Sequence, residues 1–352
     1  MAEQQSLTNL TQDDLKNLLE TWGEPPFRAG QIWDWLYRQY VTSFDEMTNL
    51  PKQLRQRLAA AYILNPLRPI ATLNSTDGLT TKTLFILPDK AQIEAVLMRY
   101  NKRRTLCIST QAGCALDCPF CATGQMGFLR NLTAGEIVAQ VLYYSRRLKA
   151  GNEQVTNLVF MGMGEPLANY AASWQAIRRL NNPGGFNLGA RRMTLSTVGL
   201  VPAIRRMSRE PERVGLAVSL HAPTDAVRDK LVPLNRRYPL ATLMQACRDY
   251  VAATGRRITF EYALMDGQND SPAQADQLAK LLAGLRCHVN LIPLNPTPGS
   301  PYRGSPQERV YAFQDRLQKQ AIPTTVRLRR GIDIEAGCGQ LQTARAAASQ
   351  NT

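Results

Sequence analysis

The stretch Cys114-Ala115-Leu116-Asp117-Cys118-Pro119-Phe120-Cys121 contains three thiols in the spacing C-x3-C-x2-C. Thiolate is the soft ligand that binds iron–sulfur clusters, and a complete [4Fe–4S] cube takes four such ligands. The stretch supplies three of them, which leaves one iron open to a ligand from outside the protein. The spacing therefore predicts a cluster loop with Cys114, Cys118 and Cys121 as its ligands.

Zinc is the alternative occupant of such a loop. A structural zinc site usually combines one C-x2-C pair with a second pair, so that all four positions are closed. Here the nearest additional cysteine is Cys107, which is expected on a strand before the loop, and His221 and His288 are distant in sequence. Three thiols without any ligand are a weaker interpretation, because small buried cysteines are normally scattered through a core. The pattern favours the cluster.

The composition indicates a large basic protein with an anionic partner. The 352 residues carry a formal net charge of +14, with 44% hydrophobic residues, enough for a sizeable core. Such a charge favours a polyanion or an acidic membrane surface. Arg-Arg pairs recur from Arg103-Arg104 to Arg329-Arg330. A single pair can be a solvated helix face, but together they favour a surface that contacts RNA.

The cysteine count and the polar amino-terminal residues indicate a cytoplasmic protein. An odd number of cysteines, seven, argues against a disulfide framework in so long a chain. We find no apolar signal region and no run of about 18 apolar residues, so no membrane partner is expected. The reducing cytoplasm also suits an oxygen-sensitive cluster.

Changes in the pattern of apolar and turn residues divide the chain into four parts. Residues 1–66 are expected to form a small helical domain, 67–100 a β-meander linker, 101–345 an α/β barrel and 346–352 a disordered tail. The aromatic residues of the helical part can form its core or belong to an RNA-binding surface. The expected helices there are Gln12–Thr21, Phe27–Tyr40 and Pro51–Tyr62, and the meander strands are Ile70–Leu73, Thr83–Leu87 and Gln92–Arg99.

Alternating strands and helices in the third part predict a parallel sheet, closed or partly closed into a barrel. The expected strands are Thr105–Ser109, Val155–Met161, Met193–Ser196, Gly215–Leu220, Ile258–Leu264, Val289–Leu294 and Thr324–Leu328. Catalytic groups of α/β barrels come from the carboxyl ends of the strands. The cluster loop follows the first strand, and further candidates stand at the ends of others: Gly162-Met163-Gly164-Glu165-Pro166, Ser196, Ser219-Leu220-His221 and Asn295-Pro296.

The C-x3-C-x2-C spacing is the signature of the radical S-adenosylmethionine (SAM) superfamily. The text CISTQAGCALDCPFCATGQMGF at 107–128 resembles the RlmN/Cfr family of RNA adenine methyltransferases, most closely its RlmN branch, and the similarity runs from about Leu15 to Arg345. The resemblance implies a partial (β/α)6 barrel with an N-terminal RNA-binding helical domain. It also implies one [4Fe–4S] cluster per chain, whose open iron is ligated by SAM, and two SAM molecules per turnover. The implied SAM contacts are Gly164, Glu165, Ser196, Ser219, Leu220, His221 and Asn295, although His221 could also be a satisfied core histidine.

The resemblance assigns roles to three further residues. Cys338, flanked by glycines, matches the family's methyl-carrying cysteine, and an accessible thiol suits a nucleophile. Cys107 matches the resolving cysteine, which forms a transient disulfide with Cys338, and Glu94 matches the proton acceptor. From the residues alone, Cys107 would be a core cysteine and Glu94 a surface carboxylate. Cys247 and Cys287 match nothing and are expected to be structural.

The implied reaction methylates C2 of adenine 2503 in 23S ribosomal RNA and C2 of adenine 37 in tRNAs. Cys338 takes a methyl group from one SAM, and a 5′-deoxyadenosyl radical from a second SAM removes hydrogen from that methyl group. The methylene radical adds to C2, a base takes the C2 proton, and attack of Cys107 on the Cys338 sulfur releases the RNA. A flavodoxin- or ferredoxin-type electron donor and a thiol reductant are the implied protein partners.

Three points stay open at this stage. Either Glu94 or Cys107 can take the C2 proton. Cfr-type methylation at C8 of the same ribosomal adenine is the nearest alternative activity, because it uses the same cysteines. A non-catalytic RNA-binding protein stapled by zinc is the remote alternative.

Overall fold

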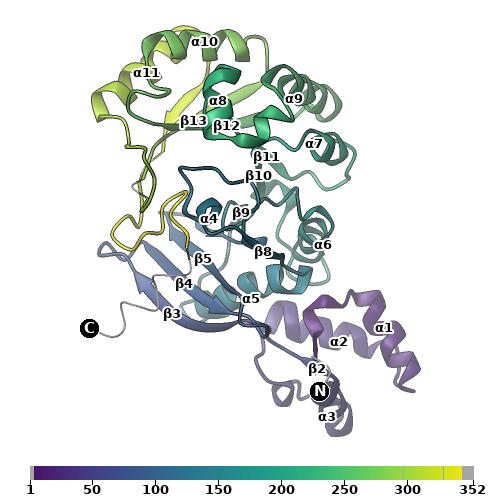
Figure 1. Ribbon diagram of the computed structural model, residues 1–352. Coiled ribbons are helices and arrows are strands. Elements are labelled where there is room, and N and C mark those ends of the chain that lie inside the picture. The colour runs from purple at the N-terminus through teal and green to yellow at the C-terminus, as the bar shows by residue number, and fades with distance from the viewer. Residues whose placement is uncertain (1–3, 296, 328, 343–352) are drawn as a thin grey trace.

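The computed structural model describes residues 4–295, 297–327 and 329–342, and its centre is a ten-stranded sheet (Figure 1). The parallel strands are β6 (Arg104–Cys107), β9 (Asn157–Phe160), β10 (Met193–Thr197), β11 (Gly215–Ser219), β12 (Ile258–Leu264), β13 (Cys287–Pro293) and β14 (Thr324–Val326). They lie side by side in chain order, each pairing in parallel with the next. Pro296 and Leu328, from the predicted loop and strand, lie outside the described residues.

Helices connect the parallel strands as crossovers. The connecting helices are α5 (Ala134–Ala150), α6 (Tyr170–Asn181), α7 (Val201–Met207), α8 (Asp225–Leu231), α9 (Leu240–Thr254), α10 (Pro272–Leu282) and α11 (Gln307–Lys319). α5 begins at a capping box in which the Thr133 side chain accepts from the Glu136 amide. Because β14 and β3 are the two ends of the strand order, the sheet is curved but open, and the partial (β/α)6 barrel is confirmed.

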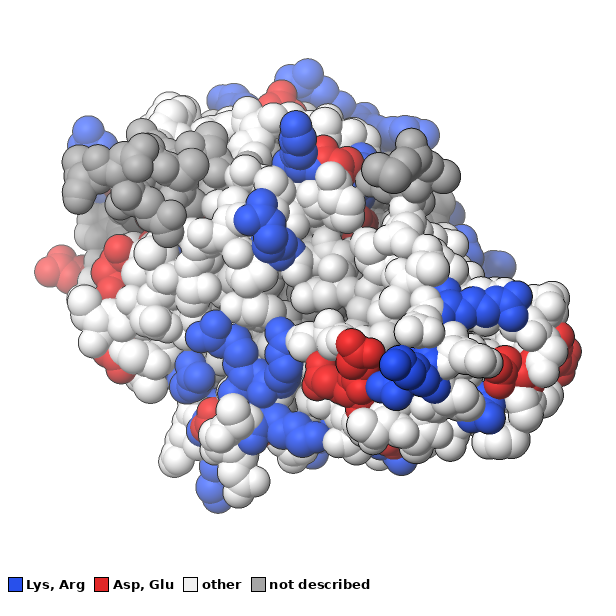
Figure 2. Space-filling view, turned by 90° about the horizontal axis from the view of Figure 1, so that it is seen from below, with Lys and Arg blue, Asp and Glu red and all other residues white. Residues whose placement is uncertain are grey.

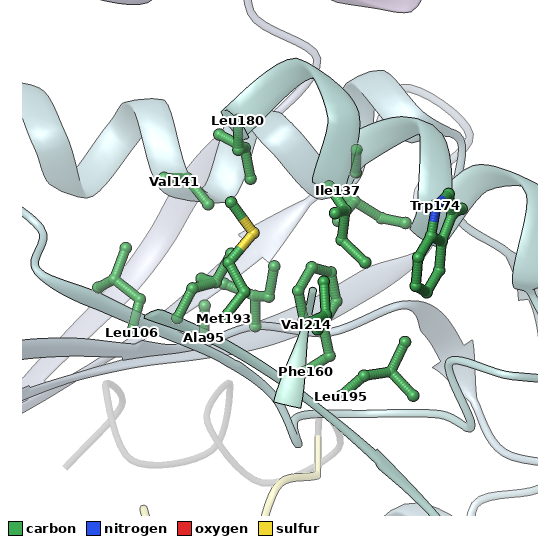
Figure 3. Close-up of a cluster of buried hydrophobic side chains, with 14 of the residues drawn as sticks. Ala95, Leu106, Ile137, Val141, Phe160, Trp174, Leu180, Met193, Leu195 and Val214 are labelled. Carbon is green, nitrogen blue, oxygen red and sulfur yellow. The ribbon is translucent and has the colours of Figure 1, made fainter. Parts of the chain in front are cut away.

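The main core lies between the sheet and the helices α5 and α6 (Figure 3). The apolar side chains that meet there are each at most 3% exposed: Ala95, Leu106, Ile137, Val141, Phe160, Trp174, Leu180, Met193 and Leu195. Burial of this apolar surface is the main free-energy gain that holds α5 and α6 on the sheet. It fixes the strands, and with them the loops at their carboxyl ends.

The meander extends the same sheet. Its strands β3 (Arg68–Asn74), β4 (Thr80–Ile86) and β5 (Gln92–Arg99) pair antiparallel, and β5 continues antiparallel onto β6. The strands predicted from residues 67–100 are therefore present. The meander is connected to the barrel by the polypeptide and also by the backbone hydrogen bonds between β5 and β6. The predicted tail, 346–352, lies outside the described residues.

The N-terminal part is helical, as predicted. It contains α1 (Gln12–Thr21), α2 (Arg28–Asp34) and α3 (Lys52–Ala61), with a π-helical turn η2 (Trp35–Gln39). The expected helix Phe27–Tyr40 changes to this wider turn after Asp34 and ends at Tyr40, whose φ is 59°. Trp33 and Tyr37 are at most 2% exposed and their ring centroids lie 4.3 Å apart, so these aromatics form the core of the domain. Short elements here are β1 (Gln5–Ser6), β2 (Tyr62–Ile63), η1 (Leu7–Asn9) and η3 (Phe44–Glu46).

The sequence did not predict the small elements around the cluster loop, because they are too short to show a periodic pattern. They are β7 (Gln111–Gly113), α4 (Ala122–Gln125) and β8 (Phe128–Asn131), and two 3-10 turns elsewhere are η4 (Ala190–Arg192) and η5 (Pro233–Arg236). β7 and β8 form a hairpin around the loop. Within the described part of the chain, no helix combines the length and apolar character that a bilayer crossing requires.

Candidate active site

The loops at the carboxyl ends of the parallel strands surround one cavity of about 160 Å³. Its walls include the three cysteines of the cluster loop and most of the predicted SAM contacts. These residues are Cys114, Cys118, Cys121, Gly164, Glu165, Ser196, Ser219, His221 and Asn295, and Cys338 also lines the cavity. The prediction that strand ends bring these residues together is confirmed.

The cluster loop is held in a tight turn beside its hairpin. The Cys114 amide donates to the Gly127 carbonyl (2.9 Å), and the Cys121 amide donates to the Cys118 carbonyl (3.0 Å). A Cβ atom on Gly124 would lie 3.0 Å from the Cys118 backbone, so only glycine fits there without displacing the loop. The three thiols therefore occupy fixed positions on one side of the cavity.

Burial and mutual proximity raise the pKa values of these thiols. Burial raises the pKa of Cys114 to about 11, and for Cys118 it acts together with the neighbouring thiols Cys121 and Cys114. Burial also raises the pKa of Cys121, against hydrogen bonds from the backbone of Gly124 and Thr123. Three thiols that repel each other as thiolates need a bound cation to become ionised together, and iron is such a cation.

The loop after β9 combines close backbone approach with a buried carboxylate. Gly164 has φ = 94°, and a Cβ there would lie 2.4 Å from the Gln111 side chain. Glu165 accepts from the amides of Val198 (2.9 Å) and Leu167 (3.0 Å). Burial raises its pKa to about 7, against these two donors. Glu165 therefore ties the loop after β9 to the loop after β10, in addition to lining the cavity.

His221 is neutral and its tautomer is fixed. Its Nδ1 accepts from the Ala263 amide (3.0 Å), which leaves the ring proton on Nε2. Burial lowers its pKa to about 3, with a further contribution from the cationic Arg228. The ring lines the cavity and stands edge-on to Phe120 of the cluster loop, at a centroid distance of 5.0 Å. It is both a structural histidine and a group of the cavity wall.

The other predicted SAM contacts differ in how they face the cavity. Ser196 and Ser219 are joined by their hydroxyls (3.4 Å), whereas the buried Oδ1 of Asn295 has no hydrogen-bond partner among the described residues. Leu220 does not line the cavity: its side chain is fully buried in the core, its amide donates to Glu261 O and its carbonyl accepts from Arg228. The backbone leaves the strand conformation here: β11 ends at Ser219 and His221 has a φ of 58°, so the His221 ring lines the cavity while the Leu220 side chain packs in the core.

These residues fit the [4Fe–4S] cluster and SAM that the C-x3-C-x2-C spacing implies. The donor set is three thiols on one wall, and Asn295 Oδ1 is a free buried acceptor on the opposite strand ends. Across 4–295, 297–327 and 329–342, no three or more Cys, His, Asp or Glu side chains already form a cage for a single metal ion. The cluster loop would hold the cluster, and Gly164, Ser196, Ser219, His221 and Asn295 would contact SAM.

A second cavity of about 110 Å³ adjoins the first, and Cys338 lies in the wall that both share. The second cavity is lined by Cys107, Tyr100 and three arginines: Arg327, Arg329 and Arg330. Residues common to the two walls are Cys121, Thr123, Met161, Gly162, Ile292, Asn295, Arg327, Cys338 and Gly339. The Asn295 side chain donates to the Cys338 carbonyl (3.3 Å) and the Ala122 amide to the Gly339 carbonyl (2.7 Å). Cys338 is thereby held against the cluster loop.

Cys107 and Glu94 lie apart from the first cavity. Cys107 ends β6 and lines the second cavity with Cys338, and burial raises its pKa to about 12, with Cys338 adding to the effect. All seven cysteines are free thiols, so the transient Cys107–Cys338 disulfide stays a prediction. Glu94 is fully buried on β5 and lines neither cavity. Its carboxylate contacts Lys82 and the Gln342 amide.

Arg327 and Glu261 belong to the site but were not found from the sequence. Arg327 lines both cavities, and Glu261, on β12, lines the first. Their side chains lie 3.8 Å apart. The negative charge of Cys338, followed by that of Glu261, raises the pKa of Arg327. Arg327 follows the last strand in a run that contains several arginines, and only its place directly after β14 distinguishes it.

The pKa of His221 leads to a prediction about acid stability. The folded pKa of about 3 lies below the unfolded value of 6.5, so the protein loses stability as the pH falls below about 6.5. Between pH 7.5 and 5.5 this amounts to about 1.4 kcal/mol. His221→Asn removes the titration while its Oδ1 can still accept from Ala263, and asparagine tolerates the positive φ of 58°.

We therefore expect urea unfolding of the variant to show a smaller loss of free energy between the two pH values. His288 is present in both proteins and cancels in the comparison. An equal loss in the two proteins would contradict the assigned protonation of His221.

A partial (β/α)6 barrel whose first strand leads into a three-cysteine loop defines the class of radical SAM enzymes. Residues 108–279 match the model of the radical SAM superfamily, and residues 5–64 match that of the "Ribosomal RNA large subunit methyltransferase N-terminal domain". The chain belongs to the RlmN family.

The similarity to individual relatives extends over almost the whole chain. A "Probable dual-specificity RNA methyltransferase RlmN" of Chloroflexus aurantiacus is 52% identical, over 96% of this chain and 93% of the relative. A "Dual-specificity RNA methyltransferase RlmN 1" of Myxococcus xanthus is 50% identical, over 96% of this chain and 94% of the relative. The crystal structure of a radical SAM methyltransferase from Sphaerobacter thermophilus has 54% identity and a TM-score of 0.95, covering 96% of this chain and 99% of that one.

Proposed function

We propose that this chain is a radical SAM methyltransferase that methylates C2 of the adenines 2503 in 23S ribosomal RNA and 37 in tRNAs, with Cys338 as methyl carrier. The observation that supports it most is the place of Cys338 in the wall between two cavities. The first cavity contains the candidate cluster and SAM contacts. The second contains Cys107 and an aromatic and basic lining. A thiol between them can receive a methyl group on one side and deliver it on the other.

When bound, the cluster and two SAM molecules per turnover supply a methyl cation equivalent and a 5′-deoxyadenosyl radical. The protein holds these groups through Cys114, Cys118 and Cys121 and through the polar side chains of the strand ends. His221 offers its Nε2 proton as a donor, and Asn295 offers Oδ1 as an acceptor.

The second cavity suits a nucleobase. The guanidinium groups of Arg330 and Arg103 lie over the Tyr100 ring, with their central carbons 4.5 and 4.7 Å from its centroid. A base can stack on such a guanidinium plane, or on the ring after displacing an arginine. The remaining arginines can bind the adjoining phosphates. Since an adenine within folded RNA cannot reach such a cavity, it has to be flipped out of its stack. Figure 2 shows a group of Lys and Arg side chains close together on the face that is seen there, a surface that can bind an RNA backbone.

The covalent bonds that form and break on the protein are those of the Cys338 and Cys107 sulfurs. The Cys338 thiolate takes the methyl group, and the methylene carbon later joins C2 while remaining on the sulfur. The adduct would return one electron to the cluster and lose the C2 proton to a base. The Cys107 thiolate then attacks the Cys338 sulfur, the bonding pair of the carbon–sulfur bond stays with the carbon, which takes up a proton and becomes the methyl group, and a disulfide remains. Two electrons from a thiol reductant restore the thiols. Arg327 lines both cavities together with Cys338 and opposes the raised pKa of Cys107, so it favours the Cys107 thiolate.

Glu94 can act as the proton acceptor only after a movement of the chain. Its carboxylate lines neither cavity and is hydrogen-bonded to Gln342 (3.0 Å), so the segment that carries Cys338 has to shift before it reaches a bound base. Cys107 already lines the second cavity and could take the proton instead. The helical N-terminal domain is proposed to bind RNA, and a flavodoxin- or ferredoxin-type protein to supply electrons.

The test is an anaerobic methylation assay. Reconstituted protein is incubated with SAM, dithionite and either a 23S ribosomal RNA fragment or tRNA, and the digested RNA is analysed by mass spectrometry. We expect 2-methyladenosine from both substrates. Formation of 8-methyladenosine would indicate the Cfr-type activity instead. Bound zinc without iron, and no SAM cleavage, would indicate a non-catalytic RNA-binding protein.

A further inference from the structure

The segment that carries Cys338, residues 331–342 and hereafter the Cys338 segment, lies across the meander (Figure 1). One pair of side chains beneath it, Lys82 on β4 and Glu94 on β5, is almost completely removed from water. Lys82 is 5% exposed and Glu94 is fully buried, and Lys82 Nζ lies 3.1 Å from Glu94 Oε1. The register pairs Leu84 with Glu94, so Lys82 and Glu94 are diagonal neighbours on one face of the sheet.

Each partner of this pair also contacts the backbone of the Cys338 segment, one before Cys338 and the other after it. Lys82 Nζ donates to the Glu335 carbonyl (3.2 Å), three residues before Cys338. The Gln342 amide donates to Glu94 Oε2 (3.0 Å), four residues after it. The backbone of Glu94 is in turn fixed to the barrel, because its carbonyl accepts from Ser109 (2.6 Å) and its amide points at the Met163 sulfur (3.3 Å). Ser109 lies shortly before the cluster loop, and Met163 lies two residues before Glu165.

We propose that the Lys82–Glu94 pair is a clamp that positions the Cys338 segment against the barrel, with Lys82 as a positioning residue for the methyl-carrying thiol. The proposal rests on the proposed function for the role of Cys338, but the clamp itself rests on the contacts alone.

Stability is a poor explanation for this pair. Removing two charges from water costs several kcal/mol per ion by general estimates, and well-packed apolar residues are often as stable as a buried ion pair. What apolar residues cannot do is donate to the Glu335 carbonyl and accept from the Gln342 amide. The Cys338 segment has few apolar anchors of its own: of its residues only Leu341, Gln340 and Gly331 are buried. Polar contacts therefore do most of the positioning: Asn295 and Ala122 attach the segment to the cluster-loop side of the cavities, and Lys82 and Glu94 attach it to the meander.

The experiment compares Lys82→Met with wild type by hydrogen exchange of the cluster-loaded, full-length protein. We expect amides at 335–342 to exchange at least about tenfold faster in the variant, the effect of losing one charge-assisted hydrogen bond. Iodoacetamide should also alkylate Cys338 faster, as measured by peptide mass mapping. Lys82→Arg should restore slow exchange. Lys90→Met, an exposed lysine in the turn between β4 and β5, is the matched control and should behave as wild type.

A double variant separates positioning from folding. Lys82→Met/Glu94→Leu contains no unpaired buried charge, so it should regain the wild-type melting temperature while exchange at 335–342 stays fast. Slow exchange in this variant, or wild-type exchange in Lys82→Met, would overturn the clamp. If instead the segment loosens as expected but wild-type Cys338 never acquires a methyl group, the proposed function fails and the clamp stands.

Discussion

Replacement of Cys338 by alanine is expected to abolish RNA methylation while the cluster remains bound. Cys338 lies between the two cavities. Two cysteines line both of them, Cys338 and the predicted cluster ligand Cys121. Without its sulfur the methyl group has no carrier, so product should fall by at least about a thousandfold, to background. The measurement is methyladenosine per chain after anaerobic incubation, with iron content determined on the same sample.

The effect should be specific to this thiol. Cys338→Ala retains Cys114, Cys118 and Cys121, so its iron absorbance and its cleavage of SAM under dithionite should match those of wild type. Cys287→Ala is the control, because Cys287 is a buried free thiol at the amino end of β13, the end of the sheet opposite the cavity. It should keep full activity. Loss of iron from Cys338→Ala would mean that Cys338 is a cluster ligand, and methylation by that variant would remove it from the reaction.

The parts of the site that the sequence predicted are those that depend on local spacing and on strand order. The cysteine loop has its own spacing, and parallel strands bring their carboxyl ends to one edge wherever they are adjacent. Ser196, Ser219, His221 and Asn295 were therefore found without knowledge of distances. The exception, Leu220, lies just after the end of β11 at Ser219, where the chain leaves the strand and His221 has a φ of 58°.

The remaining parts depend on contacts between segments that are far apart in the chain. Glu94 is predicted to be a surface carboxylate because carboxylates are seldom buried, yet the Cys338 segment, whose Gln342 is 248 residues away in sequence, contacts it and it is fully buried. Nothing in the local sequence distinguishes Lys82 from an exposed lysine, because its partner Glu94 lies on the neighbouring strand. The π-helical turn after Asp34 also escaped prediction, because an insertion of this kind leaves the helical pattern of apolar residues nearly unchanged.

Replacement of Cys107 by alanine should produce a different defect, the accumulation of a covalent protein–RNA adduct. Cys107 lines the second cavity with Cys338, and Cys338 is close enough to add to the raised pKa of Cys107. In the proposed reaction the methylene carbon is bonded to both Cys338 sulfur and adenine C2, and only attack by a second thiolate on that sulfur breaks the carbon–sulfur bond. Without Cys107 the reaction stops there.

We therefore expect Cys107→Ala to form up to one adduct per chain and to release methylated RNA at less than about one hundredth of the wild-type rate, since the resolving nucleophile is missing. Denaturing gels with labelled RNA would show the adduct, and mass spectrometry would locate the nucleotide on the Cys338 peptide. Cys107→Ala/Cys338→Ala should form none, because it lacks the carrier. Repeated clean turnover by Cys107→Ala would exclude Cys107 as the resolving thiol, and an adduct on any other residue would exclude Cys338 as the carrier.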